Sequence, residues 1–168
     1  NIDGFGKKIV ENFYKLKFIK YPQDIFMLKY DKIETLEGWG KLSIENLKYS
    51  INEKKKISLE RFIYSLGIRH IGLENAKLIS KYFNAFSNFK NLSKKNNYKD
   101  LLNIDGIGET QVNSIKYFFS NKINLKILDE LEKILTITNA QIEKKNGPLK
   151  NKTFLVTGKL REISRAEV

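Results

Sequence analysis

One pattern of twelve residues occurs four times in this sequence, as IDGFGKKIVENF (residues 2–13), LEGWGKLSIENL (36–47), IRHIGLENAKLI (68–79) and IDGIGETQVNSI (104–115). In each copy a turn with an apolar centre is followed by a glycine and then by apolar residues at helical spacing. The copies begin 34, 32 and 36 residues apart, which indicates an internal repeat. We therefore expect four pairs of helices, each joined by a tight turn.

The residue types in the turn have a physical reason. A Gly-x-Gly segment lets the backbone adopt positive φ and leaves no side chain over the amides that begin the next helix. These amides have no partner within the helix and lie at the positive end of its dipole, where phosphate commonly binds. Four such sites, spaced by whole helical units, would follow a phosphate backbone. The apolar centres Phe5, Trp39, Ile71 and Ile107 are expected to pack inward rather than to insert between bases.

The candidate DNA-binding residues are the glycines of the turns and the basic side chains next to them. They are Gly4, Gly6, Lys7, Lys8, Gly38, Gly40, Lys41, Arg69, Gly72, Gly106 and Gly108. Lysines follow the glycine in the first two copies and add charge-assisted contacts. Glu74 and Glu109 occupy the first helical turn in the last two copies, where they repel phosphate. We therefore predict that the first two copies bind more tightly.

Two residues of the third copy leave alternatives open. His70 replaces the first glycine of the turn, and we interpret it as a turn residue in preference to a DNA contact. Arg69 lies just before that position, and it would either reach phosphate or pair with Glu74 or another carboxylate. The run of residues 54–56, three lysines, is most simply a solvated surface, although it adds long-range attraction for a polyanion.

Composition favours a folded, polyanion-binding protein. The 168 residues are 41% hydrophobic and 12% aromatic, which is not the composition of a disordered segment. Basic residues outnumber acidic ones by 31 to 19, giving a net charge of +12. Abundant Lys, Asn and Ile with scarce Arg suggest a bias toward AT-rich codons. That bias explains lysine in place of arginine but not the excess of lysine over glutamate.

The sequence offers no catalytic or metal site. It contains no cysteine and one histidine, which excludes disulfides and thiolate zinc sites within these residues. No Ser/His/Asp set or carboxylate cluster stands out. No apolar run approaches the roughly 20 residues that span a bilayer, so we expect a cytoplasmic protein without a membrane partner. The sequence starts inside its first repeat, and we interpret it as part of a longer chain.

Periodicity predicts an all-α domain over residues 1–138, a polar linker over 139–148, and a strand-like segment within 149–168. Ser58 is the expected N-cap of a helix through residue 66, and Gly67 is expected to end it. The helices are expected at residues 7–16, from Pro22, 31–36, 41–52, 59–66, 73–83, 109–120 and 124–135, with a loop carrying one helical turn at 87–97.

The repeat resembles the helix-hairpin-helix motif, and the order of motifs resembles the C-terminal part of the bacterial NAD-dependent DNA ligases. The most specific matches are LGIRHIG at residues 66–72 and NKTFLVTGKL at 151–160. The resemblance implies two pseudo-twofold pairs of motifs, one and two then three and four, that contact both strands of duplex DNA. It also implies that 149–168 begin a BRCT domain of α/β fold.

The resemblance further implies a parent enzyme that seals nicks, joining a 3′-hydroxyl to a 5′-phosphate in replication and repair. Nicked double-stranded DNA and the rest of the ligase chain would be the partners. NAD, magnesium and zinc are expected in the parent and none of them in this chain. The family's Lys-x-Asp-Gly adenylation motif is missing here, so these residues alone should be inactive. A nuclease or branch-binding protein with the same motifs, or a helical protein-interaction scaffold, remains an alternative.

Overall fold

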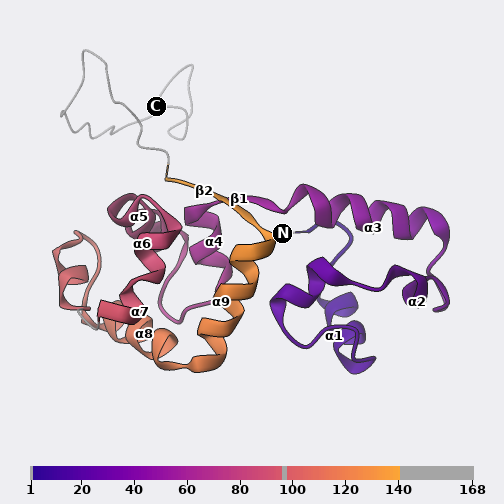
Figure 1. Ribbon diagram of the computed structural model, residues 1–168, viewed down its shortest axis with the longest axis horizontal. Coiled ribbons are helices and arrows are strands. Elements are labelled where there is room, and N and C mark those ends of the chain that lie inside the picture. The colour runs from indigo at the N-terminus through magenta and orange to yellow at the C-terminus, as the bar shows by residue number, and fades with distance from the viewer. Residues whose placement is uncertain (1, 96–97, 141–168) are drawn as a thin grey trace, which may run out of the picture.

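The computed structural model describes residues 2–95 and 98–140, and this part of the chain is mostly helical (Figure 1). Its elements, in chain order, are α1 (Lys7–Lys15), the 3₁₀ helix η1 (Pro22–Met27), α2 (Tyr30–Glu34), α3 (Lys41–Glu53), β1 (Lys56–Ser58), α4 (Leu59–Ser65), α5 (Leu73–Phe83), α6 (Phe86–Lys90), α7 (Leu92–Lys95), the 3₁₀ helix η2 (Lys99–Asn103), α8 (Glu109–Ser120), α9 (Lys122–Ile134) and β2 (Thr136–Thr138). The predicted BRCT piece and most of the predicted linker lie outside the described residues.

The buried apolar side chains form two clusters. One is built from α1, α2, α3 and the segments between them, and the other from α4 through α9. In Figure 1 the first group of helices lies to one side of α9 and the second group to the other. Phe26 of η1 packs against both clusters and so joins them. Each cluster carries two of the four repeats.

The first cluster is centred on an aromatic group. Phe13 is fully buried, and its ring lies 5.7 Å from Phe5, 5.7 Å from Phe18 and 5.4 Å from Trp39, centroid to centroid. Such contacts add to the stabilisation from burial alone. Phe5 and Trp39 are the apolar centres of the first two turns. Their inward packing confirms the expectation that these rings belong to the core.

Several predicted elements match the structure and a few do not. The helices at 73–83 and 109–120 have the predicted bounds. The segment 87–97, predicted as a loop with one helical turn, contains two short helices, α6 and α7. Helix α9 begins two residues earlier than predicted because Asn121 caps it, accepting a hydrogen bond from the amide of Ile123. Ser58 occupies the N-cap of α4 but makes no side-chain capping bond.

The all-α prediction was wrong in one respect. Strands β1 and β2 form a parallel pair in the register Lys56↔Thr136, Ile57↔Ile137 and Ser58↔Thr138. Ile57 and Ile137 both pack against the second cluster, which accounts for the pairing. The run of lysines at 54–56 therefore ends inside a strand. The amide of Ala140 then donates to the carbonyl of Asn84 at 2.9 Å, so the chain remains attached to α5 beyond β2.

All four repeats contain the same turn. A backbone hydrogen bond closes each one: Phe5 to Ile2, Trp39 to Leu36, Ile71 to Ile68 and Ile107 to Ile104, at 3.0–3.1 Å. The residue before the apolar centre has positive φ in every copy, namely Gly4 (+72°), Gly38 (+82°), His70 (+62°) and Gly106 (+86°). A turn of this kind requires positive φ at that position. His70 therefore takes the place of the first glycine, as predicted for a turn residue.

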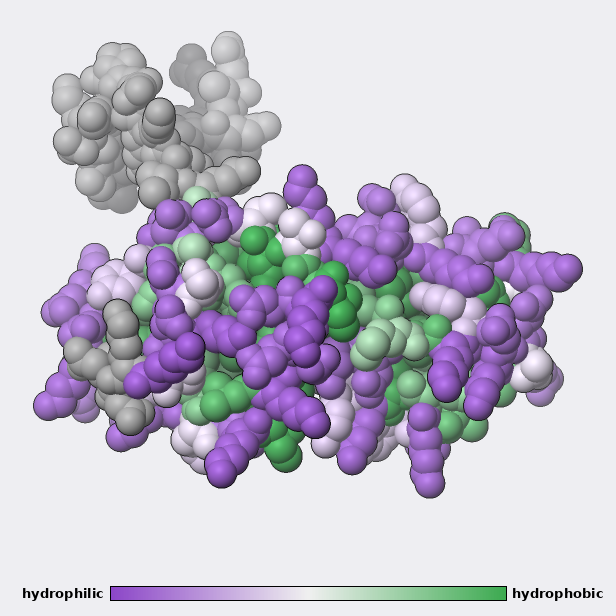
Figure 2. Space-filling view, viewed as in Figure 1, coloured by the Kyte–Doolittle hydropathy of each residue, from purple (hydrophilic) through white to green (hydrophobic). Residues whose placement is uncertain are grey.

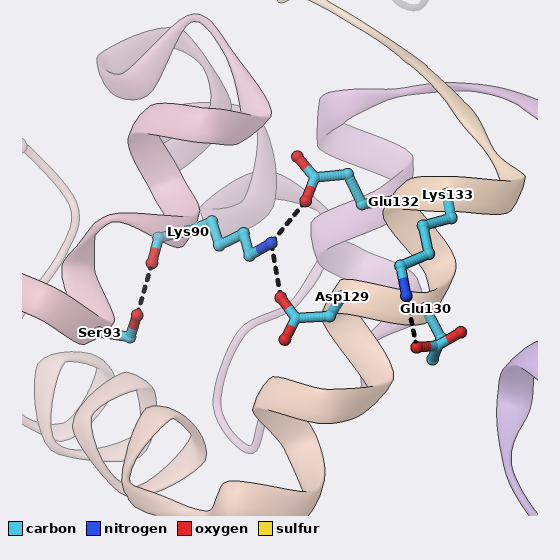
Figure 3. Close-up of polar contacts among 6 residues, drawn as sticks. All are labelled: Lys90, Ser93, Asp129, Glu130, Glu132 and Lys133. Atoms are coloured by element: carbon cyan, nitrogen blue, oxygen red, sulfur yellow. Dashed lines mark hydrogen bonds and ion pairs between the residues drawn. The ribbon is translucent and has the colours of Figure 1, made fainter.

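An ion-pair group connects α6 to α9 (Figure 3). The ammonium of Lys90 contacts the carboxylate of Asp129 at 2.6 Å and that of Glu132 as well, and its side chain is only 26% exposed. Burial lowers the pKa of Lys90, but the hydrogen bonds and charges of the two carboxylates outweigh this effect and raise it overall. A single lysine therefore bridges two segments that are 42 residues apart in the chain.

We predict that Lys90→Met lowers the free energy of unfolding by about 1 kcal/mol at pH 7, because the two carboxylates lose their partner. The folded-state pKa of Lys90 lies above the unfolded value of about 10.4, so this contribution is fully present below that pH and is lost as the pH rises through the folded pKa. Urea unfolding at pH 7, 9 and 11 measures it. A difference of the same size at all three pH values would attribute the loss to packing. Lys133→Met, which removes an exposed pair within α9, should cost less.

We predict that His70→Gly raises the free energy of unfolding by roughly 0.5–1 kcal/mol, because glycine removes the cost of positive φ while adding some chain entropy. Arg69→Gly is the matched control. Arg69 has no positive φ, so the same substitution one residue earlier should lower the stability. Urea unfolding of the two variants provides the comparison, and a destabilised His70→Gly would show that the imidazole contributes contacts of its own.

Candidate nucleic-acid interface

The second glycine of each turn begins the long helix that follows it. Gly6, Gly40, Gly72 and Gly108 are the N-caps of α1, α3, α5 and α8, all with extended backbone and all exposed. A Cβ built on Gly6, Gly40 or Gly72 would meet no heavy atom within 4 Å. At these three helix starts the space beside the glycine is therefore open.

Three of the four helix starts have a free N-cap amide. Within the described residues, the amides of Gly6, Gly40 and Gly72 donate no hydrogen bond, and the first acceptor-bound amides of these helices come later, at Ile9, Ile44 and Ala76. The unpaired N–H groups lie at the positive ends of helices of 9, 13 and 11 residues. An anion at these positions gains several hydrogen bonds and a favourable dipole together.

The fourth helix start is different, and the sequence reasoning missed the difference. The amide of Gly108 donates to the side-chain oxygen of Gln111 at 3.2 Å. The available signal was the glutamine at the third position of the helix, where a Gln or Glu side chain often folds back onto the N-cap amide. The first amide of α8 is thus already paired within the chain.

The third turn also has a side-chain contact, but there the side chain binds a backbone carbonyl of the turn and leaves the N-cap amide of Gly72 free. The carboxamide of Asn75 donates to the carbonyl oxygen of His70 at 3.0 Å and so holds the strained turn residue in place. Glu74 pairs with Lys77 at 2.8 Å. Pairing of Arg69 with Glu74, one of the alternatives, is therefore not observed. Arg69 is exposed and has no ion-pair partner among residues 2–95 and 98–140.

The basic side chains near the first two turns are exposed. Lys7 is 89% exposed and lies 3.9 Å from Glu11, a weak pair. Lys8 and Lys41 are exposed and make no ion pair with any described residue. On the face shown in Figure 2, hydrophilic side chains cover most of the surface and project from its edges, with apolar side chains gathered between them. These lysines are available for charge-assisted contacts with an anion at the helix starts.

The turns lie close together in pairs. Asp3 and Gly4 of the first turn and Gly38 and Trp39 of the second line one hollow, whose floor includes Leu47 of α3. In the second cluster, the Cβ position of Gly106 lies 3.0 Å from the side chain of Leu78 on α5, the helix that follows the third turn. The first and second repeats are therefore neighbours, and the fourth repeat packs against the third.

Two negative findings concern the part of the chain that the structure describes. None of its helices has the length and apolar character needed to cross a membrane. It also contains no group of three or more His, Cys, Asp or Glu side chains placed to hold a metal ion. The features that remain for ligand binding in these residues are the helix starts and the basic side chains around them.

Comparison with known proteins agrees with this geometry. A family described as the helix-hairpin-helix motif matches residues 61–128, which contain the third and fourth turns. The DNA ligase of Pelagibacter ubique is 66% identical over 167 residues, covering 99% of this chain and 25% of that protein. The DNA ligases of Rickettsia bellii and Wolbachia pipientis are 40% and 41% identical, over 99% of the chain and 26% of each protein.

The chain thus spans about a quarter of the length of the curated relatives that it matches. The first two turns lie outside the matched family segment, but they have the same closing hydrogen bond and the same positive φ as the last two. Residues 61–128 match the helix-hairpin-helix motif, and nearly the whole chain is similar to about a quarter of the DNA ligases of Pelagibacter ubique and Rickettsia bellii.

Proposed function

We propose that this chain binds duplex DNA without reading its base sequence, through backbone amides and lysines at helix-hairpin-helix turns, and that its four turns are arranged as two pseudo-twofold pairs. The observation that carries the proposal is the set of exposed, unpaired amides at the starts of α1, α3 and α5. Amides bind phosphate, which is the same at every nucleotide, so they position a protein on DNA without specifying a sequence. The net charge of +12 supports a polyanionic partner.

We further propose that the chain acts as part of a cytoplasmic NAD-dependent DNA ligase, which seals nicks between a 3′-hydroxyl and a 5′-phosphate in replication and repair. The homology to a quarter of several DNA ligases supports this role. The rest of the ligase chain and a nicked duplex would be the partners. Residues 149–168 would begin a BRCT domain, joined to residues 1–138 by a linker at 139–148.

The cofactors of such an enzyme would be held elsewhere in the parent protein. Zinc prefers cysteine and histidine ligands, and these 168 residues contain no cysteine and one histidine. The absence of a Lys-x-Asp-Gly motif from these residues leaves no lysine to carry the adenylate supplied by NAD. Magnesium and NAD therefore have no site here that we can name. This chain would contribute DNA binding and no step of the chemistry.

We predict that the double variant Gly6→Val, Gly40→Val binds nicked duplex at least about tenfold more weakly, because each valine covers amides that would otherwise make hydrogen bonds to charged phosphate. The double variant Gly72→Val, Gly108→Val should lose less, since Glu74 and Glu109 already weaken the second pair. Fluorescence polarisation with a labelled nicked duplex measures both affinities.

These substitutions are suitable tests because they should not disturb the fold. All four glycines have extended φ and ψ, which valine adopts readily, and the Cβ at Gly6 and Gly40 meets open space. Urea midpoints close to that of the native chain would verify this point. An equal or larger loss from the second double variant contradicts the order of the pairs. Unchanged affinity in both variants contradicts binding through the amides.

We predict that affinity falls steeply with salt, with a slope of roughly −0.9 in log K against log [salt] for each phosphate neutralised, and that it changes little with base sequence. Titrations of two unrelated nicked duplexes between 50 and 200 mM salt, a range over which about six contacts would cost ~10³ in affinity, test both points. A slope near zero would mean that the positive charge is incidental. Failure to bind either duplex would instead favour the protein-interaction alternative.

A further inference from the structure

The fourth turn is set apart by a hydrogen bond between its own helix start and a side chain. The amide of Gly108 donates to the Oε1 atom of Gln111 at 3.2 Å. A backbone N–H can only donate, so the side-chain oxygen must face it. Gln111 is the third residue of α8, and its side chain therefore folds back over the position where a phosphate oxygen would lie.

The residues at the same position of the other three helices leave the amide free. The side chain of Ile9 in α1 has no polar atom, and the side chain of Ser43 in α3 makes no hydrogen bond within the described residues. Asn75 in α5 is one methylene shorter than glutamine, and its carboxamide donates to the carbonyl of His70. Only at α8, among these four helix starts, does a side chain accept from the N-cap amide.

A second, independent observation concerns access to the fourth turn. A Cβ placed on Gly106 would lie 3.0 Å from Cδ1 of Leu78, whereas one placed on Gly4 or Gly38 would meet nothing within 4 Å. The side chain of Leu78, from α5, therefore covers one side of the fourth turn. Glu109 adds a negative charge in the first turn of α8, which opposes an incoming phosphate.

We propose that Gln111 competes with phosphate for the amide of Gly108, so that three of the four turns bind the DNA backbone through their N-cap amides and the fourth does not. This inference rests on the proposed function. Displacing the carboxamide would cost the existing hydrogen bond and bring phosphate next to Glu109. The side chain of Gln111 thereby sets the number of phosphates that the domain contacts through N-cap amides, which in turn affects its affinity.

The test compares the native chain with Gln111→Ala by ¹⁵N–¹H correlation spectra during titration with nicked duplex. In the native chain we expect the amide signals of Gly6, Gly40 and Gly72 to shift, while that of Gly108 stays in place. In Gln111→Ala the Gly108 signal should shift as well. Affinity should rise by up to about tenfold, the value of one further hydrogen bond.

Two variants serve as controls. Asn75→Ala removes the side chain at the same helix position of α5 and should leave the Gly108 signal in place during the titration, because Asn75 holds no amide. Gln111→Glu keeps an acceptor for Gly108 and adds a charge, so its Gly108 signal should stay in place during the titration. This variant preserves the cap, so it tests the inference even if Gln111→Ala is destabilised.

The outcomes separate this inference from the proposed function. Shifts at Gly6, Gly40 and Gly72 accompanied by an equal shift at Gly108 in the native chain would overturn the role of Gln111 and leave DNA binding intact. A Gly108 signal that does not respond in Gln111→Ala would overturn it as well. A titration in which none of the four glycine amides shifts would remove amide-based DNA binding itself, and this inference with it.

Discussion

The structure depends on one local constraint, which is a tight turn closed by a backbone hydrogen bond and passing through a residue with positive φ. The bond from Phe5 to Ile2 is repeated at the other three turns, and each turn places an apolar side chain inward at its centre. Burial of that side chain fixes the direction in which the next helix leaves the core. The free N-cap amides of α1, α3 and α5 follow as a consequence, because each of these helices starts at an exposed glycine that has no side chain of its own to cover them. Packing and ligand access are thus two results of the same turn.

The repeated part of the fold could be predicted because each repeat encodes its own structure. Apolar residues at helical spacing and glycines at the turn specify a local conformation, and neither depends on distant partners. The bounds of α5 and α8 and the burial of Ile44, Leu47 and Ile51 in α3 were predictable for that reason. His70 was also interpretable as a turn residue, because the other three copies show what its position requires.

The parts that could not be predicted depend on contacts between distant segments or on the reach of one side chain. Strands β1 and β2 are three residues each and lie about 80 residues apart. Neither is long enough to show the alternating apolar and polar residues that predict a strand. The link from Lys90 to Asp129 and Glu132 is likewise visible only once α6 and α9 are side by side. At the candidate site, the sequence pattern predicted the glycines. It distinguished the four helix starts only by the charged side chains next to them. The difference between Asn75 and Gln111 is one methylene, and it decides whether a side chain reaches a carbonyl or an amide.

The two apolar clusters give the four turns a rigid spacing that loops alone would not provide. Two turns line one hollow over the first cluster, and the other two are joined through α5 and α8 over the second. Phe26 packs on both clusters, so the two pairs do not move as independent units without losing that contact. Phosphates on a duplex have fixed separations, and a protein that reads only phosphates must match them with its own fixed separations to bind tightly. In the proposed binding mode, the buried aromatic residues around Phe13 and the contact of η1 with the second cluster would hold the turns at these separations, although none of them would touch the ligand.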